Sequence, residues 1–377
     1  MDALTTPSNW QRVRLGDIGK PCMCKRVMKH QTTPYGEIPF YKIGTFGNTA
    51  DAFISKKLFL EYKTKYSFPK KGDILISASG TIGRAVIYDG KPAYFQDSNI
   101  VWIDNDETLV KNDFLFYAYS NIKWNTEYTT ILRLYNDNFR NTLIPLPPLN
   151  EQIAIANILS DVDRYLYSLD ALILKKESVK KALSFELLSQ RKRLKGFNQN
   201  WQKVRLGDIC EIVKGQQINK ISLNNTDKYP VINGGIDFLG YTNKFNISKN
   251  TIAISEGGTC GYVRFMTSDF WSGGHNYSLQ KISNKVNNLC LYHILKSYEK
   301  DIMKLGVGSG LKNIQLKALK DFEILLPPLN EQIAIANILS DVDHEIISLK
   351  NKKRQFENIK KALNHDLMSA KIRILKK

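Results

Sequence analysis

The sequence has few cysteines and few histidines, and neither kind is clustered. Five cysteines and five histidines are spread over 377 residues. An odd number of scattered cysteines is typical of reduced thiols and not of a disulfide framework. Cys22 and Cys24 have no second cysteine pair and no grouped histidines with which to complete a tetrahedral zinc site. We therefore expect no metal site and a reducing, cytoplasmic location.

Long apolar runs and nucleotide-binding motifs are also missing. No apolar stretch approaches the twenty residues of a spanning helix, and the first ten residues have neither the basic start nor the apolar core of a secretory signal. The chain has no GxxxxGK[ST], HExxH or GxSxG motif and no Asn-Pro-Pro-aromatic element of amino-methyltransferases. The glycines of 306–310 lack the spacing and the βαβ setting of a dinucleotide loop. The sequence predicts neither catalysis nor a cofactor bound by this chain.

Negative charge is in the minority. The chain has 54 lysines and arginines against 36 acidic residues, a formal net charge of +18. Residues 1–150, 151–195, 196–330 and 331–377 are each net positive, so the excess is not confined to a tail. This distribution favours a polyanion such as DNA contacted by folded surfaces in both halves, although charge alone also fits a soluble basic protein with no such partner.

An eighteen-residue block, LPPLNEQIAIANILSDVD, is present twice without a change. It occupies 146–163 and 326–343, an offset of 180 residues, and KKAL at 180–183 returns at 360–363. Self-similarity at a fixed long offset indicates a repeated architecture. The chain is predicted to be two copies of one half.

Weaker echoes define the content of each half. WQRVRLGDI at 10–18 returns as WQKVRLGDI at 201–209, and ISASGTIG at 76–83 returns as ISEGGTCG at 254–261. Elsewhere the two globular parts differ. We predict a first domain over 1–145, a helical spacer over 146–195, a second domain over 196–325 and a second helical spacer over 326–377.

Each block should begin a long helix at about Asn150 or its repeat. Two prolines end the preceding segment, Asn150 can cap, and Glu151 lies in the first turn, where negative charge favours the helix dipole. Apolar residues then recur in steps of three and four, as in a coiled coil, over a rod of roughly 65 Å. The two rods are predicted to pair antiparallel about a pseudo-two-fold axis. Lysines 176, 180, 353 and 360 interrupt the seam, where they either fix the register or, as we favour, extend along the surface to solvent.

Polar residues inside the block are identical in the two copies. If packing alone were at stake, outward polar positions would have diverged as the globular domains did, so we predict two equivalent docking sites for two copies of one partner. A recent duplication at the gene level is the alternative. Charge reversal at Glu151 and Asp161 is expected to abolish partner binding. The predicted docking residues are Glu151, Gln152, Asn157, Asp161, Glu331, Gln332, Asn337 and Asp341.

The globular parts should contain short strands with polar side chains at the glycine-rich turns that follow them. Residues 73–77 and 251–255 alternate as strands do, and the glycines after them favour tight hairpins over ligand-binding loops. Arginine and lysine suit guanine, and asparagine and glutamine suit adenine. The candidate DNA-binding residues are Lys42, Ser77, Thr81, Arg84, Arg133 and Arg140 in the first domain, and Gln216, Gln217, Asn233, Ser255, Thr259, His275, Asn276 and Lys312 in the second.

With two divergent domains alternating with PPLNEQIAIANILSDVD helices, the chain resembles the specificity subunit of type I restriction-modification systems. The resemblance covers essentially the full length and includes the WxxxxLGDI openings at 10–18 and 201–209. The segment GLKNIQLKALKDFEILLPPLNEQ at 310–332 is similar to the closing segment of that family, whereas LYNDNFRNTLIPLPPLNEQ at 134–152 departs from it.

The resemblance implies an α+β fold in which two mixed α/β target recognition domains are separated by two long helices that pair as an antiparallel coiled coil. It implies a non-catalytic subunit in which each domain reads one half of a split, asymmetric DNA site. The partners would be double-stranded DNA, two methyltransferase subunits and, through the complex, endonuclease subunits. S-adenosylmethionine, ATP and Mg are then expected on the partner subunits, and no membrane is involved.

Two other classes of function remain. One is a self-contained methyltransferase or nuclease, which the missing motifs disfavour. The other is a protein scaffold built on a coiled coil that reads no DNA. Salt-dependent binding to random DNA would argue against the scaffold, because phosphate neutralisation releases counterions.

Overall fold

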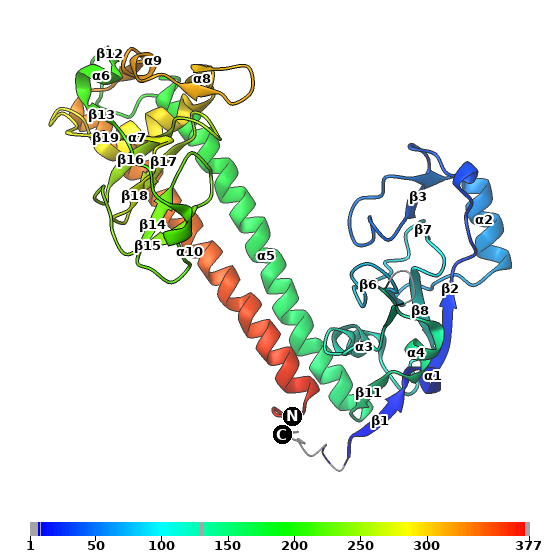
Figure 1. Ribbon diagram of the computed structural model, residues 1–377. Helices are drawn as coiled ribbons and strands as arrows, with labels where there is room; N and C mark the ends of the chain where they lie inside the picture. The colour runs from blue at the N-terminus through cyan, green and yellow to red at the C-terminus, as the bar shows by residue number, and fades with distance from the viewer. Residues whose placement is uncertain (1–6, 8, 129–131, 374–377) are drawn as a thin grey trace. The chain divides into compact units, whose positions relative to one another are not determined.

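A computed structural model describes residues 7, 9–128 and 132–373. Contacts divide the chain into two compact units, one of residues 1–169 with 352–377 and the other of residues 170–351. Each unit holds one globular domain and parts of two long helices (Figure 1). The outermost residues of the first and last predicted segments, 1–6 and 374–377, lie outside the described residues.

The first globular domain is built on two small sheets. One has the order β2-β8-β5-β6 and is antiparallel, and the other has the order β4-β3-β7, with β3 and β7 parallel. The strands are β1 Gln11–Arg14, β2 Gly19–Met23, β3 Ile38–Tyr41, β4 Phe53–Ile54, β5 Ile74–Ser77, β6 Ala85–Ile87, β7 Tyr94–Phe95, β8 Ile100–Asn105, β9 Glu127–Tyr128, β10 Leu132–Arg133 and β11 Leu143–Leu146. The helices are α1 Leu15–Ile18, η1 Lys29–Gln31, α2 Lys56–Lys65, α3 Asn112–Tyr119 and α4 Asn136–Asn141.

The second globular domain repeats this plan. Its sheets have the orders β13-β19-β16-β17 and β15-β14-β18, with the same antiparallel and parallel pairings in the corresponding places. The strands are β12 Gln202–Arg205, β13 Glu211–Lys214, β14 Tyr229–Ile232, β15 Gly240–Thr242, β16 Thr251–Ser255, β17 Val263–Met266, β18 Trp271–Ser272, β19 Asn276–Gln280, β20 Gly306–Val307, β21 Asn313–Ile314 and β22 Glu323–Leu326. The helices are α6 Leu206–Ile209, η2 Lys220–Ser222, α7 Asn288–Ser297, α8 Glu299–Met303 and α9 Leu316–Lys320. The α+β class and the internal repeat are therefore confirmed.

The two long helices are of equal length. α5 spans Leu149–Leu188 and α10 spans Leu329–Met368, 40 residues each. Both begin one residue before the predicted start. The buried seam residues include Leu159 and Leu339, which lie in the core of the domain that precedes each helix, so the helices complete those cores as well as contacting each other.

Within each unit the two helix segments run antiparallel. In the first unit Lys360 Nζ lies 2.5 Å from Asp163 Oδ1, and in the second unit Lys180 Nζ lies 2.5 Å from Asp343 Oδ1. Lys176 likewise pairs with Glu345 of the facing segment. For Lys176, Lys180 and Lys360 the interpretation that they merely extend to solvent is therefore wrong, because acidic residues across the pair hold them, an arrangement that selects one register. Lys353 instead pairs with Glu357 of its own helix, at 3.6 Å.

A tryptophan joins each domain to the start of its helix. Trp10 Nε1 donates to Glu151 Oε2 at 3.1 Å, and Trp201 Nε1 donates to Glu331 Oε2 at 3.0 Å. All four side chains are buried. The WQ motif and the block are thus repeated together because they form one contact.

The neighbouring glutamine binds the main chain of the same domain. Gln152 Nε2 donates to the carbonyls of Pro147 and Leu109, at 2.8 and 3.0 Å, and its Oε1 accepts from Lys111 N at 2.8 Å. Gln332 makes the same three bonds with Pro327, Lys285 and Asn287. A fully buried amide is stable only when its groups are paired in this way.

A buried histidine in the second unit should make stability depend on pH. Burial lowers the pKa of His293 to about 4, with Lys180 adding to the effect and Asp343 opposing it. Because the unfolded side chain titrates near 6.5, the stabilisation is complete above that pH and is lost as the pH falls toward 4. A His293→Gln variant is expected to show a flatter pH dependence of the urea midpoint between pH 6.5 and 4 than the wild type. An equal slope in the two proteins would contradict this assignment.

Candidate nucleic-acid interface and docking surface

In the first domain the glycine-rich turn connects β5 and β6 as a hairpin, as predicted, and the next segments fold onto it. Ser77 N donates to Arg84 O at 3.0 Å, which closes the turn. Ala78 N donates to Asn99 O and Leu134 N donates to Ala78 O, each at 2.8 Å. Residues 78–80, 99 and 133 therefore meet at one edge of the sheet.

The same bonds recur in the second domain between β16, β17, β19 and β21. Ser255 N donates to Tyr262 O at 3.0 Å. Glu256 N donates to His275 O, and Ile314 N donates to Glu256 O, each at 2.9 Å. The backbone frame is shared, so every position at this edge of one domain has a definite counterpart in the other.

The shared frame pairs residues beyond the repeated motifs as well as within them. Because β3 pairs with β7 as β14 pairs with β18, Lys42 corresponds to Asn233. By the bonds above, Asn99 corresponds to His275. Neighbouring positions correspond in the same way, and the further pairs are Arg133 with Asn313, Ser79 with Gly257, and Arg26 with Gln217.

Three of the candidate residues in the first domain share a cavity of about 310 Å³. Ser77, Thr81 and Arg84 line it, and Arg84 Nη1 donates to the carbonyl of Phe46 at 3.0 Å. Lys42 precedes Ile43, which also lines the cavity, and its Nζ lies 2.8 Å from Asp51 Oδ1.

Arg133 joins the same edge, whereas Arg140 does not. Arg133 Nη2 donates to Asn99 Oδ1 at 2.7 Å. Arg140 lies on α4, and its backbone and side chain lie against Gly16 of α1, away from the turn. The candidate Arg140 therefore lies outside the edge that holds Arg133, because α4 packs on α1.

The candidates of the second domain are also brought together. Asn233 Oδ1 accepts from His275 N at 3.1 Å, and Thr259 N donates to the carbonyl of Gly234 at 2.8 Å. Gln216 N donates to Ser272 O at 2.8 Å, while Gln217 lies beside Gly274. Glycines at 234, 257, 258, 273 and 274 allow this close approach of four loops.

Three predicted DNA-binding residues are too deeply buried for that role. Ser77, Ser255 and Asn276 are each no more than 3% exposed. Ser77 Oγ accepts from Arg84 N at 2.9 Å and so stabilises the turn. Their assignment as DNA contacts is wrong, because β5, β16 and β19 are central strands whose residues are buried on both faces of the sheet.

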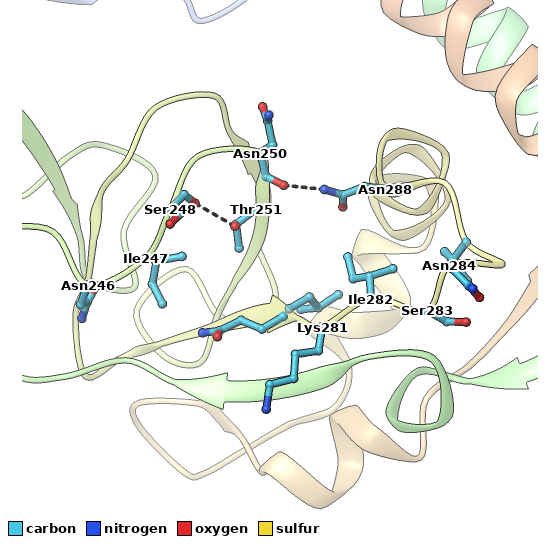
Figure 2. Close-up of a pocket in the computed structure, with 13 residues that line it drawn as sticks. Asn246, Ile247, Ser248, Asn250, Thr251, Lys281, Ile282, Ser283, Asn284 and Asn288 are labelled. Atoms are coloured by element: carbon cyan, nitrogen blue, oxygen red, sulfur yellow. Dashed lines mark hydrogen bonds between the residues drawn. The ribbon is translucent and has the colours of Figure 1, made fainter.

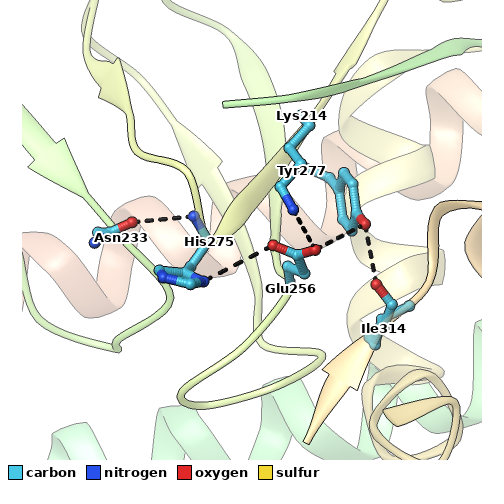
Figure 3. A network of polar contacts seen from close by, with 6 residues as sticks. All are labelled: Lys214, Asn233, Glu256, His275, Tyr277 and Ile314. Atoms are coloured by element: carbon cyan, nitrogen blue, oxygen red, sulfur yellow. Dashed lines mark hydrogen bonds and ion pairs between the residues drawn. The ribbon is translucent and has the colours of Figure 1, made fainter. Parts of the chain in front are cut away.

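Glu256 organises a polar network at the edge of the second domain (Figure 3). Lys214 Nζ lies 2.6 Å from Glu256 Oε1, and the Tyr277 hydroxyl lies 3.2 Å from the same oxygen. The exposed ring of His275 covers the other side, with Nδ1 3.9 Å from Oε2. Burial and the nearby Glu256 carboxylate raise the pKa of Tyr277 to about 12, so its hydroxyl remains a donor.

A separate polar cavity in this domain contains none of the candidate residues. It has a volume of about 480 Å³ and is lined by loop residues such as Asn246, Ser248 and Lys281 (Figure 2). Asn288 closes one side by donating to the carbonyl of Asn250.

Among the residues that the structure describes there is no group of three histidine, cysteine, aspartate or glutamate side chains suited to a metal ion.

Four residues at these two edges were not predicted from the sequence. Asn99 and Arg26 lie at the edge of the first domain, where Arg26 Nε donates to Asp97 Oδ2 at 2.9 Å, and Glu256 and Asn313 lie at the edge of the second domain. Glu256 lies inside the repeated motif, where it replaces Ala78, and that difference could have identified it. Asn99, Arg26 and Asn313 lie outside any repeated motif, and only the hydrogen bonds shared by the two domains identify them.

The predicted docking residues divide into two groups. Glu151, Gln152, Glu331 and Gln332 are buried and bonded to their own domains, so the prediction that they face a partner is wrong. The reason is that the first turn of each helix lies beneath the domain that precedes it. Charge reversal at Glu151 would therefore test folding and not docking.

The other group forms an exposed stripe on each helix. Asn157 and Asp161 are exposed, as are Asn337 and Asp341. Apolar residues continue the stripe at a spacing of four, which places them on one helix face. The stripes are Leu149, Ile153, Asn157 and Asp161 on α5, and Leu329, Ile333, Asn337 and Asp341 on α10.

Comparisons with known proteins agree with this architecture. The family described as the type I restriction modification DNA specificity domain matches residues 7–176 and 198–358, so the chain belongs to that family. The expected relationship to type I specificity subunits is thus confirmed. None of the helices in the described part of the chain is both long and apolar enough to cross a bilayer.

Relatives of the chain carry names of the same kind. A protein named as a type I restriction enzyme specificity subunit from Haemophilus influenzae is 64% identical over 148 residues, which are 39% of this chain and 38% of that relative. The match therefore spans well under half of that relative's length. The specificity subunit of type I restriction enzyme MjaVIII from Methanocaldococcus jannaschii is 27% identical over 99% of this chain and 95% of the relative.

A solved structure has the same fold. The type I restriction-modification S subunit from M. genitalium superimposes with a TM-score of 0.69 at 20% identity, covering 97% of this chain and 98% of that one. At this identity the likeness concerns the fold alone.

Proposed function

We propose that the chain is a non-catalytic specificity subunit that reads a two-part, asymmetric DNA sequence, one part with each globular domain. The observation that carries this proposal is the shared backbone frame that presents different polar side chains in the two domains. Lys42 stands where the other domain has Asn233, and Asn99 stands where it has His275. Because base edges are distinguished by donor and acceptor patterns, such differences suit two different half-sites.

The paired helices are proposed to set the separation of the half-sites. α5 and α10 would form a continuous antiparallel coiled coil with a pseudo-two-fold axis, which the opposed Asp163–Lys360 and Lys180–Asp343 pairs support. Half-sites about 34 Å apart, one turn of DNA, fall within the length of such helices.

The proposed partners are two methyltransferase subunits, bound to the two equivalent exposed stripes, with endonuclease subunits joining the complex. S-adenosylmethionine, ATP and Mg would be bound by those partners and not by this chain. The proposed location is the cytoplasm, where the host genome is the substrate.

Co-expression of the chain with its methyltransferase subunit, followed by mapping of methylated adenines in the host genome, tests the function. We expect a split, asymmetric motif that is absent when the chain is omitted. Exchange of residues 1–145 for those of another family member should change one half of the motif and leave the other half and the spacer unchanged.

Methylation that is absent, or that does not depend on the chain, would contradict the specificity role and favour a protein scaffold that reads no DNA. Binding of the purified chain to random duplex DNA separates the two further. A specificity subunit should lose affinity steeply between 50 and 200 mM salt, roughly in proportion to the phosphates contacted.

A further inference from the structure

The side chain of Arg133, at the edge of the first domain, is oriented by a hydrogen bond to Asn99. Arg133 Nη2 donates to Asn99 Oδ1 at 2.7 Å, and Ser79 Oγ donates to the same oxygen at 2.8 Å. Ser79 and Arg133 also face each other across an isolated β-bridge. The guanidinium is therefore oriented by a neutral amide, and among the described residues no other hydrogen-bond acceptor is paired with its five N–H groups.

Arg133 differs from two of its cationic neighbours in having no ion pair among the described residues. Arg26 is paired with Asp97 and Lys42 with Asp51. Glu127 faces Arg133 across the β9–β10 ladder, but its carboxylate accepts from Asn138 Nδ2 at 2.9 Å, and within the described residues no carboxylate forms an ion pair with Arg133. Arg84, the other arginine nearby, donates a hydrogen bond to the Phe46 carbonyl. It corresponds to Tyr262, whose ring packs against Lys296 and Arg264.

In the second domain both Arg133 and Ser79 are replaced by different residues. Asn313 corresponds to Arg133, and Gly257 corresponds to Ser79. A Cβ at Gly257 would lie 2.2 Å from Asn313 Oδ1, so the glycine is what gives the asparagine its room. A residue that bound only phosphate would keep its positive charge in both domains, and this one does not.

We propose that Arg133 contacts the O6 and N7 edge of a guanine in the half-site read by the first domain, with Asn99 as its positioning residue. The proposal rests on the function proposed above and assigns one base within it. Arginine presents two N–H groups in a fixed fork that matches the two guanine acceptors, and a fork already fixed by Asn99 loses little entropy on binding. Asn313 occupies the corresponding position toward the other half-site, where an amide suits adenine.

The test is selection from a randomised duplex DNA library by the full chain in complex with its methyltransferase subunits. The wild type should select a half-site that contains a guanine, and Arg133→Gln should lower the preference at that one base pair by about 10- to 100-fold. The rest of the motif should stay the same. Asn99→Ala should weaken the preference at the same base pair, and Asn99→Asp should not restore it, because a carboxylate would neutralise the guanidinium.

Two controls separate this contact from general effects. Lys57→Gln removes one exposed charge of α2 in the same domain and should leave every position of the motif unchanged. Asn313→Ala should alter only the other half-site. For the wild-type complex, 7-deazaguanine at the selected position, which lacks the N7 acceptor, should weaken binding by about 10-fold, and this measurement needs no variant protein.

The outcomes are distinguishable. If the wild type selects a motif that Arg133→Gln leaves unchanged, or if 7-deazaguanine is tolerated at every guanine of that half-site, the Arg133 contact is overturned and the specificity role stands. If the wild-type complex selects no sequence at all, the specificity role fails and the contact with it.

Discussion

Replacing Arg193 by methionine should destabilise the second unit by about 3–5 kcal/mol. Arg193 Nε and Nη2 each lie 2.8 Å from an oxygen of Glu331, whose side chain is 1% exposed. Removing one member of a buried pair leaves the other charge without compensation, which is the costly case. Among the residues that the structure describes, the indole N–H of Trp201 is the one side-chain donor to the carboxylate that would remain.

The first unit provides a matched control. Arg373 takes the corresponding place beside Glu151, but its shortest distance to the carboxylate is 3.3 Å and its side chain is 39% exposed. Because solvent screens a more open and looser pair, Arg373→Met should cost less than about half as much. Hydrogen exchange of the full chain would measure both variants, with the β12 and β22 amides as reporters of the second unit. Equal losses of protection in the two variants would contradict the ranking.

A change of the exposed stripes should remove the methyltransferase subunits from the complex. Ile153 and Ile333 are 46% and 40% exposed within otherwise identical surfaces. An aspartate at such a site would be buried without a partner on docking, so we expect affinity to fall by about 100-fold or more at the altered stripe.

The two stripes predict a graded result. Ile153→Asp or Ile333→Asp alone should leave one methyltransferase copy bound, and the double variant should leave none, as measured by native mass spectrometry of the co-expressed complex. Tyr167→Asp is the matched control, because Tyr167 is 78% exposed on the same helix but lies outside the identical block. Loss of both copies in a single variant, or of none in the double variant, would overturn two equivalent docking sites.

Much of the architecture could be predicted from the repeats. The helix starts were placed within one residue, and the strand predicted at 251–255 was found over the same residues. The helix starts could be predicted because two prolines, an asparagine and a glutamate mark each of them locally. The strand could be predicted because its short apolar run is buried at four of its five positions.

The site was only partly predictable. Glu151 and Gln152 looked like surface residues because they are polar, and the sequence cannot show that the first turn of the helix lies beneath another domain. Asn99 could not be identified because it looked like an ordinary turn residue. An asparagine before a strand is typical of a turn, and its bond to Arg133, 34 residues away, depends on tertiary structure alone.

The glutamines beneath the domains recognise main-chain atoms. Gln152 and Gln332 together form hydrogen bonds with four carbonyl oxygens and two amide nitrogens and, within the described residues, with no side chain of the loops they support. Any residue with an ordinary peptide group can supply those partners, with proline excluded only where the amide donates. These hydrogen bonds between each glutamine and its domain therefore do not depend on the side chains of the loops. A domain with almost entirely different residues can bind the same helix position.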